Sequence, residues 1–339
     1  MSLRVLTAFV ILVAAIGGSP SQRRELSASQ ERVGLNGPIP RPEGTDFRVL
    51  SWNVSGPRFI QKASGFRAII QLTDPDVLLI DEVEGGRSID EIASVLRGLR
   101  GEADTAWNII IGAGGDYQRG AVISRYPVSN VPELGRLPYP AAAFAELKST
   151  MDDATWRRAK PNLDSGIPIA AGIIQIRDRR LLGVAIDLQC CGSDWQERRR
   201  LIEVSEIRSV LQRTLLTLPV DGIVLAGDFN VVNTSMPLAM VTNPYPPPHF
   251  AMVPVPAVHL DGMDNWTWDG RGSQFPSRAL DFSLYSPASL ESLTAVVIST
   301  EDLSDAVLSA RGLETGTSRE LSDHLPIVVD YKWRTTQAK

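Results

Sequence analysis

Two short strings in the sequence place carboxylates beside amide or imidazole groups. The first is Gly227-Asp228-Phe229-Asn230, and the second is Ser322-Asp323-His324-Leu325-Pro326. Hard divalent cations such as Mg²⁺ prefer oxygen ligands, and imidazole transfers protons near neutral pH. Asp and Asn are also frequent turn residues, so either string alone could be a plain turn. Taken together, the two strings suit metal-assisted chemistry on a phosphate group.

Apolar runs place these strings at the ends of predicted strands. Residues 222–226 form a buried strand ahead of Asp228, and residues 325–329 form another after His324. Two further polar residues follow early strands, namely Asn53 and Glu82. Because strand side chains alternate, Asp228 and Asn230 share one face. We therefore expect these groups to gather at one edge of a sheet.

The rest of the pattern predicts strands separated by single helices, some of them in hairpin order. Apolar spacing predicts a helix over 59–72. Ser88 with Glu91 forms a capping box for the next helix, whose inner face is expected to be Ile89, Ile92, Leu96 and Leu99. Ser193 and Gln196 form a second capping box, for a long helix that ends before Pro219. The strands are expected at 47–54, 77–80, 107–111, 120–127 with a closing proline turn, 169–177, 180–188, 222–226, 266–268, 280–285, 294–299 and 325–331. This order favours a mixed α/β sandwich.

The start of the chain has the pattern of a secretory signal peptide over residues 1–21. A short basic start precedes an apolar run over 5–16, and small residues with a proline follow. The run is shorter than the roughly 20 residues that span a bilayer, so an uncleaved anchor is the less favoured alternative. Residues 22–46 are expected to be a disordered leader. We expect one domain over 47–334 in a periplasmic or secreted monomer, with no stable membrane insertion after signal cleavage.

Composition limits the partners and the redox chemistry. The net charge is −5, so any polyanion must be met by a local patch rather than a global field. The candidate patches, each of which could equally be a solvated face, are Arg157, Arg158 and Lys160; Arg177, Arg179 and Arg180; and Arg198 to Arg200. Cys190 and Cys191 are adjacent and cannot join distant elements. A vicinal disulfide and two free, buried thiols both stay open.

In chain order, the polar groups at strand ends resemble those of the endonuclease/exonuclease/phosphatase superfamily. The matching strings lie at 51–54, 76–83, 120–127, 227–230, 280–282 and 322–326, and they span nearly the whole chain after the leader. The resemblance implies a four-layered sandwich of two mixed β-sheets flanked by helices. Members include deoxyribonuclease-I-like nucleases, abasic-site endonucleases, deadenylases, sphingomyelinases and inositol polyphosphate phosphatases, so the match says less about substrate.

The resemblance also implies roles for the site residues. Glu82 is expected to be the principal ligand of Mg²⁺ or Mn²⁺, with Asn53 and Asp323 completing or orienting its coordination sphere. Asp228 is expected to orient or deprotonate the attacking water, and Asn230 to donate to the charge that develops on phosphorus. His324, held by Asp281, is expected to contact a phosphoryl oxygen or to carry a proton. The expected reaction is in-line hydrolysis of a P–O bond.

One residue departs from the family pattern. Where many members carry His or Tyr, this chain has Asp187, within Ile186-Asp187-Leu188. An ionised carboxylate there would repel phosphate. Asp187 must therefore be protonated, bind a second cation, or lie further from the reacting group than the family residue does.

The expected function is that of an exported, divalent-metal-dependent phosphoric ester hydrolase. Nucleic acid, DNA or RNA, is the favoured substrate, because basic residues occur in an insertion over 141–162 as well as in the patches named above. A phospholipid or sphingomyelin-type phosphodiesterase is the alternative enzyme. A catalytically weakened module that binds phosphate ligands is the alternative of another class, and Asp187 is its chief support.

Overall fold

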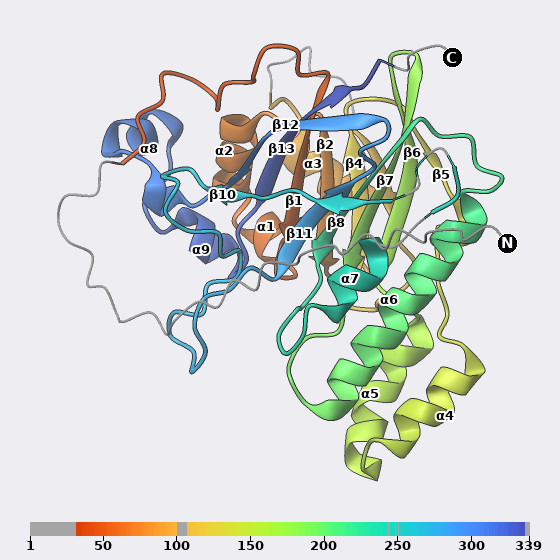
Figure 1. Cartoon of the computed structure of the whole chain (residues 1–339). Coiled ribbons are helices and arrows are strands. Elements are labelled where there is room, and N and C mark those ends of the chain that lie inside the picture. Colours follow the sequence, from red (N-terminus) through yellow and green to blue (C-terminus); the bar gives the residue numbers. More distant parts are fainter. Residues whose placement is uncertain (1–31, 100–106, 243–244, 248, 250, 336–339) are drawn as a thin grey trace, which may run out of the picture. The chain divides into compact units, whose positions relative to one another are not determined.

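The computed structural model describes residues 32–99, 107–242, 245–247, 249 and 251–335, which fold as two β-sheets stacked face to face (Figure 1). The first sheet has the strand order β10 (Val258–His259), β12 (Leu290–Val297), β13 (Ile327–Trp333), β1 (Phe47–Asn53), β2 (Val77–Val83), β4 (Arg119–Ser124), β3 (Asn108–Ile111). The second has the order β5 (Val128–Asn130), β6 (Ile169–Ile176), β7 (Arg179–Asp187), β8 (Gly222–Asp228), β11 (Asp281–Tyr285), β9 (Val253–Pro254). Both sheets mix parallel and antiparallel pairs.

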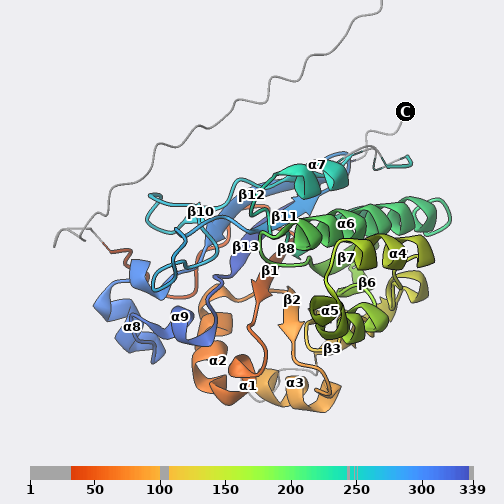
Figure 2. The same cartoon turned by 90° about the horizontal axis from the view of Figure 1, so that it is seen from below.

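Helices cover the outer face of each sheet, as Figure 2 shows from below. The first sheet packs against α1 (Arg58–Gln61), α2 (Ala63–Thr73), α3 (Ile89–Leu96), α8 (Asp305–Arg311) and α9 (Thr317–Leu321). The second packs against α4 (Ala141–Ser149), α5 (Asp153–Ser165), α6 (Asp194–Thr214) and α7 (Met236–Thr242), with the short 3₁₀ turn η1 (Pro132–Leu134) beside them. The predicted four-layered sandwich is thereby confirmed.

Alternation along the strands decides which side chains lie between the sheets. In β1, Val49 packs between the sheets while Leu50 faces the helices. In β8, Ala226 packs between the sheets and Leu225 faces α6. Because the period of a strand is two residues, the inner faces continue to Asn53 at the end of β1 and to Asp228 at the end of β8. The last inner positions of several strands therefore carry polar groups.

The chain is ordered from further upstream than predicted. The signal peptide and the leader up to residue 31 lie outside the described residues. From Arg32 onward, however, the predicted leader is attached to the domain, because the Val33 amide donates to the Asp302 carbonyl and the Arg48 guanidinium binds the carbonyls of Ile39 and Pro40. The Arg48 side chain also forms a buried salt bridge with Asp330 at 2.8 Å. The fold thus includes residues 32–46.

Three local predictions differ from the structure. The helix predicted over 59–72 is broken at Lys62, whose backbone leaves the helical region with φ −109° and ψ 43°. The predicted strand over 266–268 makes only isolated bridges, from Trp268 to Arg278 and to His324. Ile89, predicted to face the core, is 49% exposed at the start of α3. Capping by Ser88 sets the start of α3, and Ile92 and Leu96 form its buried face.

Candidate active site

The second sheet ends in a row of three aspartates. Asp187 of β7 is in register with Asp228 of β8, which is in register with Asp281 of β11. Residues opposite one another on paired strands point to the same face of the sheet. That face is the inner one, and the three residues are only 3%, 2% and 4% exposed. Three buried carboxyl groups therefore meet at one end of the gap between the sheets.

The first sheet contributes polar groups to the same end. Asn53 of β1 is in register with Asp81 of β2. The next residue, Glu82, lies in a β-bulge, since two residues of β2 oppose one residue of β4 between the pairs Ile80–Ala121 and Val83–Arg119. Glu82 adopts a φ of +54° at this bulge. The extra residue changes the direction of the Glu82 side chain. As a result, the charges of Asp81 and Glu82 both raise the pKa of the Asp187 carboxyl.

Asp81 was not predicted as a site residue, and alternation along a regular strand would put it on the face opposite Glu82. The side chain of Asp81 is fully buried, and neither carboxylate oxygen has a hydrogen-bond partner among the described residues. Burial raises the pKa of the Asp81 carboxyl well above its usual range, and the charges of Asp281 and Asp228 raise it further. The alternation of Val77, Leu79 and Asp81 on the inner face is the sequence signal that identifies it.

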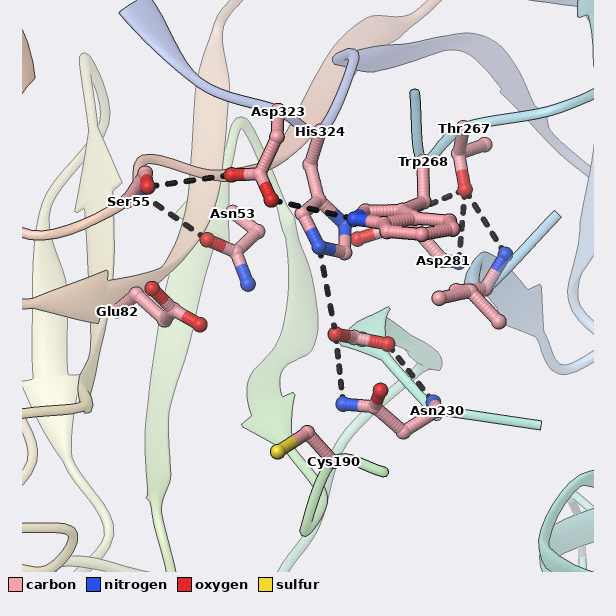
Figure 3. A network of polar contacts seen from close by, with 12 residues as sticks. Asn53, Ser55, Glu82, Cys190, Asn230, Thr267, Trp268, Asp281, Asp323 and His324 are labelled. Atoms are coloured by element: carbon pink, nitrogen blue, oxygen red, sulfur yellow. Dashed lines mark hydrogen bonds and ion pairs between the residues drawn. The ribbon is translucent and has the colours of Figure 1, made fainter. Parts of the chain in front are cut away.

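His324 is held between two of the aspartates (Figure 3). Its Nδ1 lies 2.8 Å from Oδ2 of Asp281, and its Nε2 lies 3.8 Å from Oδ2 of Asp228. Burial lowers the pKa of His324, but the charges of Asp281 and Asp228 outweigh it, and the net pKa is raised well above 6.5. Both ring nitrogens face carboxylates, so the imidazolium form is stabilised. The predicted contact between Asp281 and His324 is thus present.

Neighbouring segments fix the orientation of this pair. Thr267 Oγ1 donates to Asp281 Oδ2 at 2.6 Å, so one carboxylate oxygen receives both the threonine and the histidine. The Trp52 indole donates to the His324 carbonyl at 3.0 Å. The Ser322 hydroxyl joins the Asn53 carbonyl to the His324 amide. Thr267 was not predicted as a site residue. Its role depends on a side-chain hydrogen bond to Asp281 of β11, and local sequence does not show that contact.

Asp228 is oriented by the turn that follows it. Its two oxygens accept from the backbone amide and from Nδ2 of Asn230, each at 2.7 Å. Asn230 Nδ2 also donates to the Leu188 carbonyl at 2.8 Å. Both amide hydrogens are therefore engaged, and the predicted donation from Asn230 to phosphorus-bound oxygen would need one of these bonds to break. In this structure, Asn230 positions Asp228.

Gly227 is required by the turn at this point. Its φ is +137°, and a Cβ atom there would lie 1.9 Å from the Ile186 carbonyl oxygen. Only glycine accepts that backbone and that close approach. The glycine of the Gly227-to-Asn230 string thus lets β8 lie tightly against β7 just before Asp228.

Asn53, Glu82 and Asp323, the predicted metal ligands, lie beside one another across from Asn230 (Figure 3). Asn53 Oδ1 accepts from the Ser55 amide at 3.1 Å, while its buried Nδ2 has no hydrogen-bond partner among the described residues. Asp323 accepts from Ser55 Oγ at 3.3 Å and from the Trp268 indole at 3.1 Å. Among the described residues, the Glu82 carboxylate accepts only from Gln118, at 3.4 Å. Each group keeps free lone pairs or donors.

The donor set fits a hard divalent cation. In the described part of the chain, no lysine or arginine forms a salt bridge with the site carboxylates, which are Asp81, Glu82, Asp187, Asp228, Asp281 and Asp323. Among the described residues, the cationic group that opposes their mutual repulsion is His324. Oxygen donors around uncompensated negative charge are what Mg²⁺ and Mn²⁺ bind. Asp228, Asp281 and His324 also bring ligand atoms within 4.8 Å of one another.

The buried position of Asp187 bears on the alternatives of a protonated carboxyl and a second cation. Burial raises the pKa of its carboxyl well above the usual range, and the charges of Glu82 and Asp81 raise this pKa further. Asp187 is in register with Asp228 on the neighbouring strand. Without a cation, the structure favours the protonated form, whose O–H can donate to a phosphate oxygen.

We expect Asp187→Asn to stabilise the chelated protein. A carboxyl whose pKa is raised by folding favours the fold below its unfolded pKa, about 3.9, and that contribution is lost as pH rises through the folded pKa. An amide cannot ionise, so in EDTA at pH 8 the variant should melt about 2 °C or more above the wild type. Asp178→Asn, in the exposed β6–β7 turn, is the matched control. Equal melting of the two variants would contradict the repulsion.

Buried arginines support the loop that follows Asp187. Arg199 donates to Glu203 at 2.7 Å, and Arg200 donates to the Gln189 carbonyl at 2.7 Å and also binds the Cys191 carbonyl. These two arginines are 4% and 0% exposed. The prediction that they belong to a surface patch over 198–200 is therefore wrong. The cluster over Arg177 to Arg180 lies at the opposite end of β7 from Asp187. Among the predicted patches, Arg157, Arg158 and Lys160 are exposed on α5.

The loop held by Arg200 presents two free, exposed thiols, Cys190 and Cys191. The predicted alternative of two free, buried thiols is therefore wrong about their burial. A hydrogen bond from Cys190 lowers the pKa of the Cys191 thiol to about 6, with help from the charge of Arg200. Cys190 has a raised pKa for the converse reason. The pair shares one proton, with the thiolate on Cys191.

We expect Cys191 to react first with alkylating agents. The thiolate is the nucleophile, so at pH 7 iodoacetamide should label Cys191 at least about tenfold faster than Cys190. Peptide mass spectrometry after timed quenching measures both rates. Cys190→Ala should slow the labelling of Cys191, because the donor to its thiolate is removed. Preferential labelling of Cys190 would contradict the assignment.

Comparison with known proteins adds the decisive observation. Residues 50–324 match the sequence model of the Endonuclease/Exonuclease/phosphatase family. The chain belongs to this family. The match begins within β1 and ends at His324, so it includes every site residue described above. Members of the family are typically hydrolases of phosphoester bonds, and they generally depend on a divalent metal.

Solved structures of the same family share the fold at low sequence identity. Human Nocturnin, as a catalytic domain with bound sulfate, gives a TM-score of 0.53 at 15% identity and covers 85% of this chain and 93% of that one. A Bacteroides vulgatus endonuclease/exonuclease/phosphatase gives 0.53 at 13%, covering 85% and 99%. D. rerio TDP2 complexed with a single-strand DNA product gives 0.50 at 15%, covering 84% and 98%. No curated protein matches the chain in sequence.

In the described part of the chain, no helix combines the length and the apolar character needed to cross a bilayer.

Proposed function

We propose that the protein is a divalent-metal-dependent phosphodiesterase that acts on nucleic acid. One observation carries the proposal. Asn53, Glu82, Asp323 and His324 come from the first sheet or the segments that flank its strands. They meet Asp228 and Asp281 of the second sheet, and no lysine or arginine is paired to their carboxylates in the described chain. The two sheets thus supply a cation site and a proton-carrying pair beside one space.

The residues divide the reaction between them. A bound Mg²⁺ or Mn²⁺, held by Glu82 with Asn53 and Asp323, would neutralise charge on phosphate oxygens. Asp228, fixed by Asn230, accepts a proton from the attacking water; its raised pKa makes it a better base than an exposed aspartate. Asn53 Nδ2 is free to donate to a phosphoryl oxygen. The water then displaces the leaving oxygen in line.

The Asp281–His324 pair acts beside Asp228. Its imidazolium form presents Nε2 toward Asp228 and toward the space where a phosphoryl oxygen would lie. An N–H donor there stabilises the added negative charge or protonates the leaving oxygen. Asp281 holds the ring through Nδ1 and is itself held by Thr267.

Aromatic side chains near the site support a nucleic-acid substrate. Tyr117, 69% exposed, immediately precedes Gln118, the partner of Glu82. Trp268 is half-buried, and its indole contacts Asp323. Flat rings on both sides of a phosphate site can stack bases, with about 1–3 kcal/mol per base. The family relative TDP2 from D. rerio has been solved with a single-strand DNA product, which favours the same class of substrate.

The test is hydrolysis of bis-p-nitrophenyl phosphate and of single-stranded and plasmid DNA and RNA, with Mg²⁺ or Mn²⁺ and with EDTA. The proposal expects metal-dependent cleavage of nucleic acid, and Tyr117→Ala and Trp268→Ala should raise KM for it without the same effect on bis-p-nitrophenyl phosphate. Cleavage of the small ester but not of nucleic acid would overturn the substrate assignment. No cleavage of any substrate would favour a phosphate-binding module instead.

Exposed apolar side chains favour a lipid phosphodiester as the second candidate. Ile89, Tyr117 and Phe275 are 49%, 69% and 55% exposed, in segments next to Glu82, Gln118 and Trp268. Such side chains could enter a lipid surface beside the site. Turnover of sphingomyelin or phosphatidylcholine vesicles, lost in Phe275→Ser and Ile89→Ser, would support it. Unchanged lipid turnover in these variants would oppose a membrane contact.

We also propose that the protein is exported and acts in the periplasm or outside the cell. The signal-peptide pattern over residues 1–21 supports this. Mass spectrometry of the N-terminus in cell fractions is the test. An intact Met1 in the cytoplasmic fraction would contradict export.

A further inference from the structure

A second group of metal-ligand side chains lies apart from the candidate active site. One ligand atom from each of His259, Asp261 and Asp302 lies within 4.8 Å of the others. His259 ends β10, which pairs with β12, and Asp302 closes the 3₁₀ turn η2 (Thr300–Asp302) just after β12. Strand pairing therefore brings together residues that are distant in sequence. No role was predicted for this histidine.

The hydrogen bonds of His259 leave its Nδ1 directed at carboxylates. Its Nε2 lies 2.9 Å from the Trp266 carbonyl oxygen, which can only accept, so Nε2 carries a proton. Nδ1 lies 3.2 Å from Oδ2 of Asp302. A second partner that fixes the tautomer and frees the other nitrogen is the usual arrangement of a metal-bound histidine. The ring is 3% exposed and cannot turn toward solvent.

Asp302 supplies the second, independent observation. Its side chain is nine-tenths buried. Oδ2 lies 3.2 Å from His259 Nδ1, the position of an ion pair when the ring is protonated, but among the described residues no well-aligned hydrogen bond reaches this oxygen. The Leu260 backbone amide donates to this carboxylate. A buried carboxylate oxygen without a hydrogen bond is costly. A cation between Oδ2 and the imidazole nitrogen would remove that cost.

Asp261 completes the group from the solvent side. Its Oδ1 accepts from the Met263 amide at 2.9 Å, within the tight turn in which the Gly262 amide donates to the His259 carbonyl. Asp261 is half-buried, which leaves a route for an ion and room for a water ligand. In the described chain, neither aspartate of the group forms a salt bridge with lysine or arginine.

We propose that His259 Nδ1, Asp261 and Asp302 bind a divalent cation of the zinc class. One imidazole and two carboxylates with an open position for water suit Zn²⁺, whereas Mg²⁺ prefers oxygen ligands alone. This site is separate from the site of the proposed phosphodiesterase and shares no ligand with it.

The cation would support the active site through the segment after β10. His259 packs against Trp266 with ring centroids 4.5 Å apart, and it also holds the Trp266 carbonyl. The next two residues, Thr267 and Trp268, contact Asp281 and Asp323. Fixing His259 therefore fixes the segment that positions both carboxylates.

The test is zinc binding by the full chain in a background that removes a ligand from each of the other candidate cation sites. This background carries Glu82→Gln, His324→Asn, Cys190→Ser and Cys191→Ser. After chelation and removal of the chelator, Zn²⁺ is titrated by calorimetry, and Co²⁺ serves as the spectroscopic probe. The expected result is one equivalent of Zn²⁺ and Co²⁺ absorption bands of a low-coordinate nitrogen and oxygen site. Zinc should also protect the chain around residues 259–278 from proteolysis.

Two matched variants separate binding from folding. Asp261→Asn removes a half-buried ligand and should weaken Zn²⁺ binding by at least about tenfold. Asp264→Asn removes the same charge from an exposed position of the same turn, outside the group, and should leave affinity unchanged. His259→Gln should abolish binding, with folding checked by circular dichroism. Equal affinity in the two aspartate variants, or no zinc binding in the background protein, would overturn the proposal and leave a plain His259–Asp302 ion pair.

Discussion

Replacing Glu82 with glutamine is expected to lower metal-dependent phosphodiester hydrolysis by more than about 100-fold. Loss of a partner outside the coordination sphere already costs 10–100-fold in metal affinity or activity, and a direct ligand contributes more. The Glu82 carboxylate is available for this role because its only hydrogen bond is from Gln118 at 3.4 Å and no cationic side chain of the described chain pairs with it. Rates with bis-p-nitrophenyl phosphate across a Mg²⁺ titration measure the effect.

The matched control is Glu84→Gln. Glu84 lies two residues further along the chain and is neutralised by a salt bridge with Arg87. Its loss should change the rate less than about threefold, in keeping with the small contribution of exposed ion pairs. The Glu82 variant should also lose the rise in melting temperature that Mg²⁺ gives the wild type. A Glu82→Gln protein that keeps both its rate and its response to Mg²⁺ would remove Glu82 from the metal site.

The strand-end positions of the site could be predicted because they rest on alternation alone. Asn53 and Asp228 follow apolar inner positions of β1 and β8, and that pattern is local. Asp81 was within reach of the same rule, since it follows Val77 and Leu79 on the inner face. The bulge that places Glu82 beside Asp81 could not be predicted from alternation. A φ of +54° at a glutamate depends on the pairing of β2 with β4.

The buried arginines show where charge patterns mislead. A run of three arginines predicts a solvated face, yet Arg200 occupies the same helical stripe as Val204, Ile207 and Leu211. Its spacing from Val204 was visible in the sequence. What it binds was not, because the carbonyls of Gln189 and Cys191 come from a loop whose path depends on tertiary structure. Thr267 is a similar case, since its partner Asp281 lies on another strand.

The pair formed by Asp281 and His324 gives the second large effect. His324→Asn is expected to lower kcat/KM by about 10² to 10⁴-fold, the usual contribution of a positioned proton donor. His249→Asn is the matched control, because it removes another buried histidine, one whose side chain is bonded to none of the site residues. Stopped assays at pH 7 with Mg²⁺ measure both variants. A His324 variant as active as its control would exclude the ring from the reaction.

Asp281→Asn tests whether the pair works as an ion pair. The charges of Asp281 and Asp228 raise the pKa of His324 against the opposing effect of burial. Losing one charge should therefore lower that pKa. If the imidazolium is the active form, activity falls as pH rises through the His324 pKa, so the basic limb of the kcat/KM profile should move to lower pH in Asp281→Asn. A purely structural role for Asp281 would lower the melting temperature and leave the basic limb unmoved, and that outcome would contradict the proton-carrying role of His324.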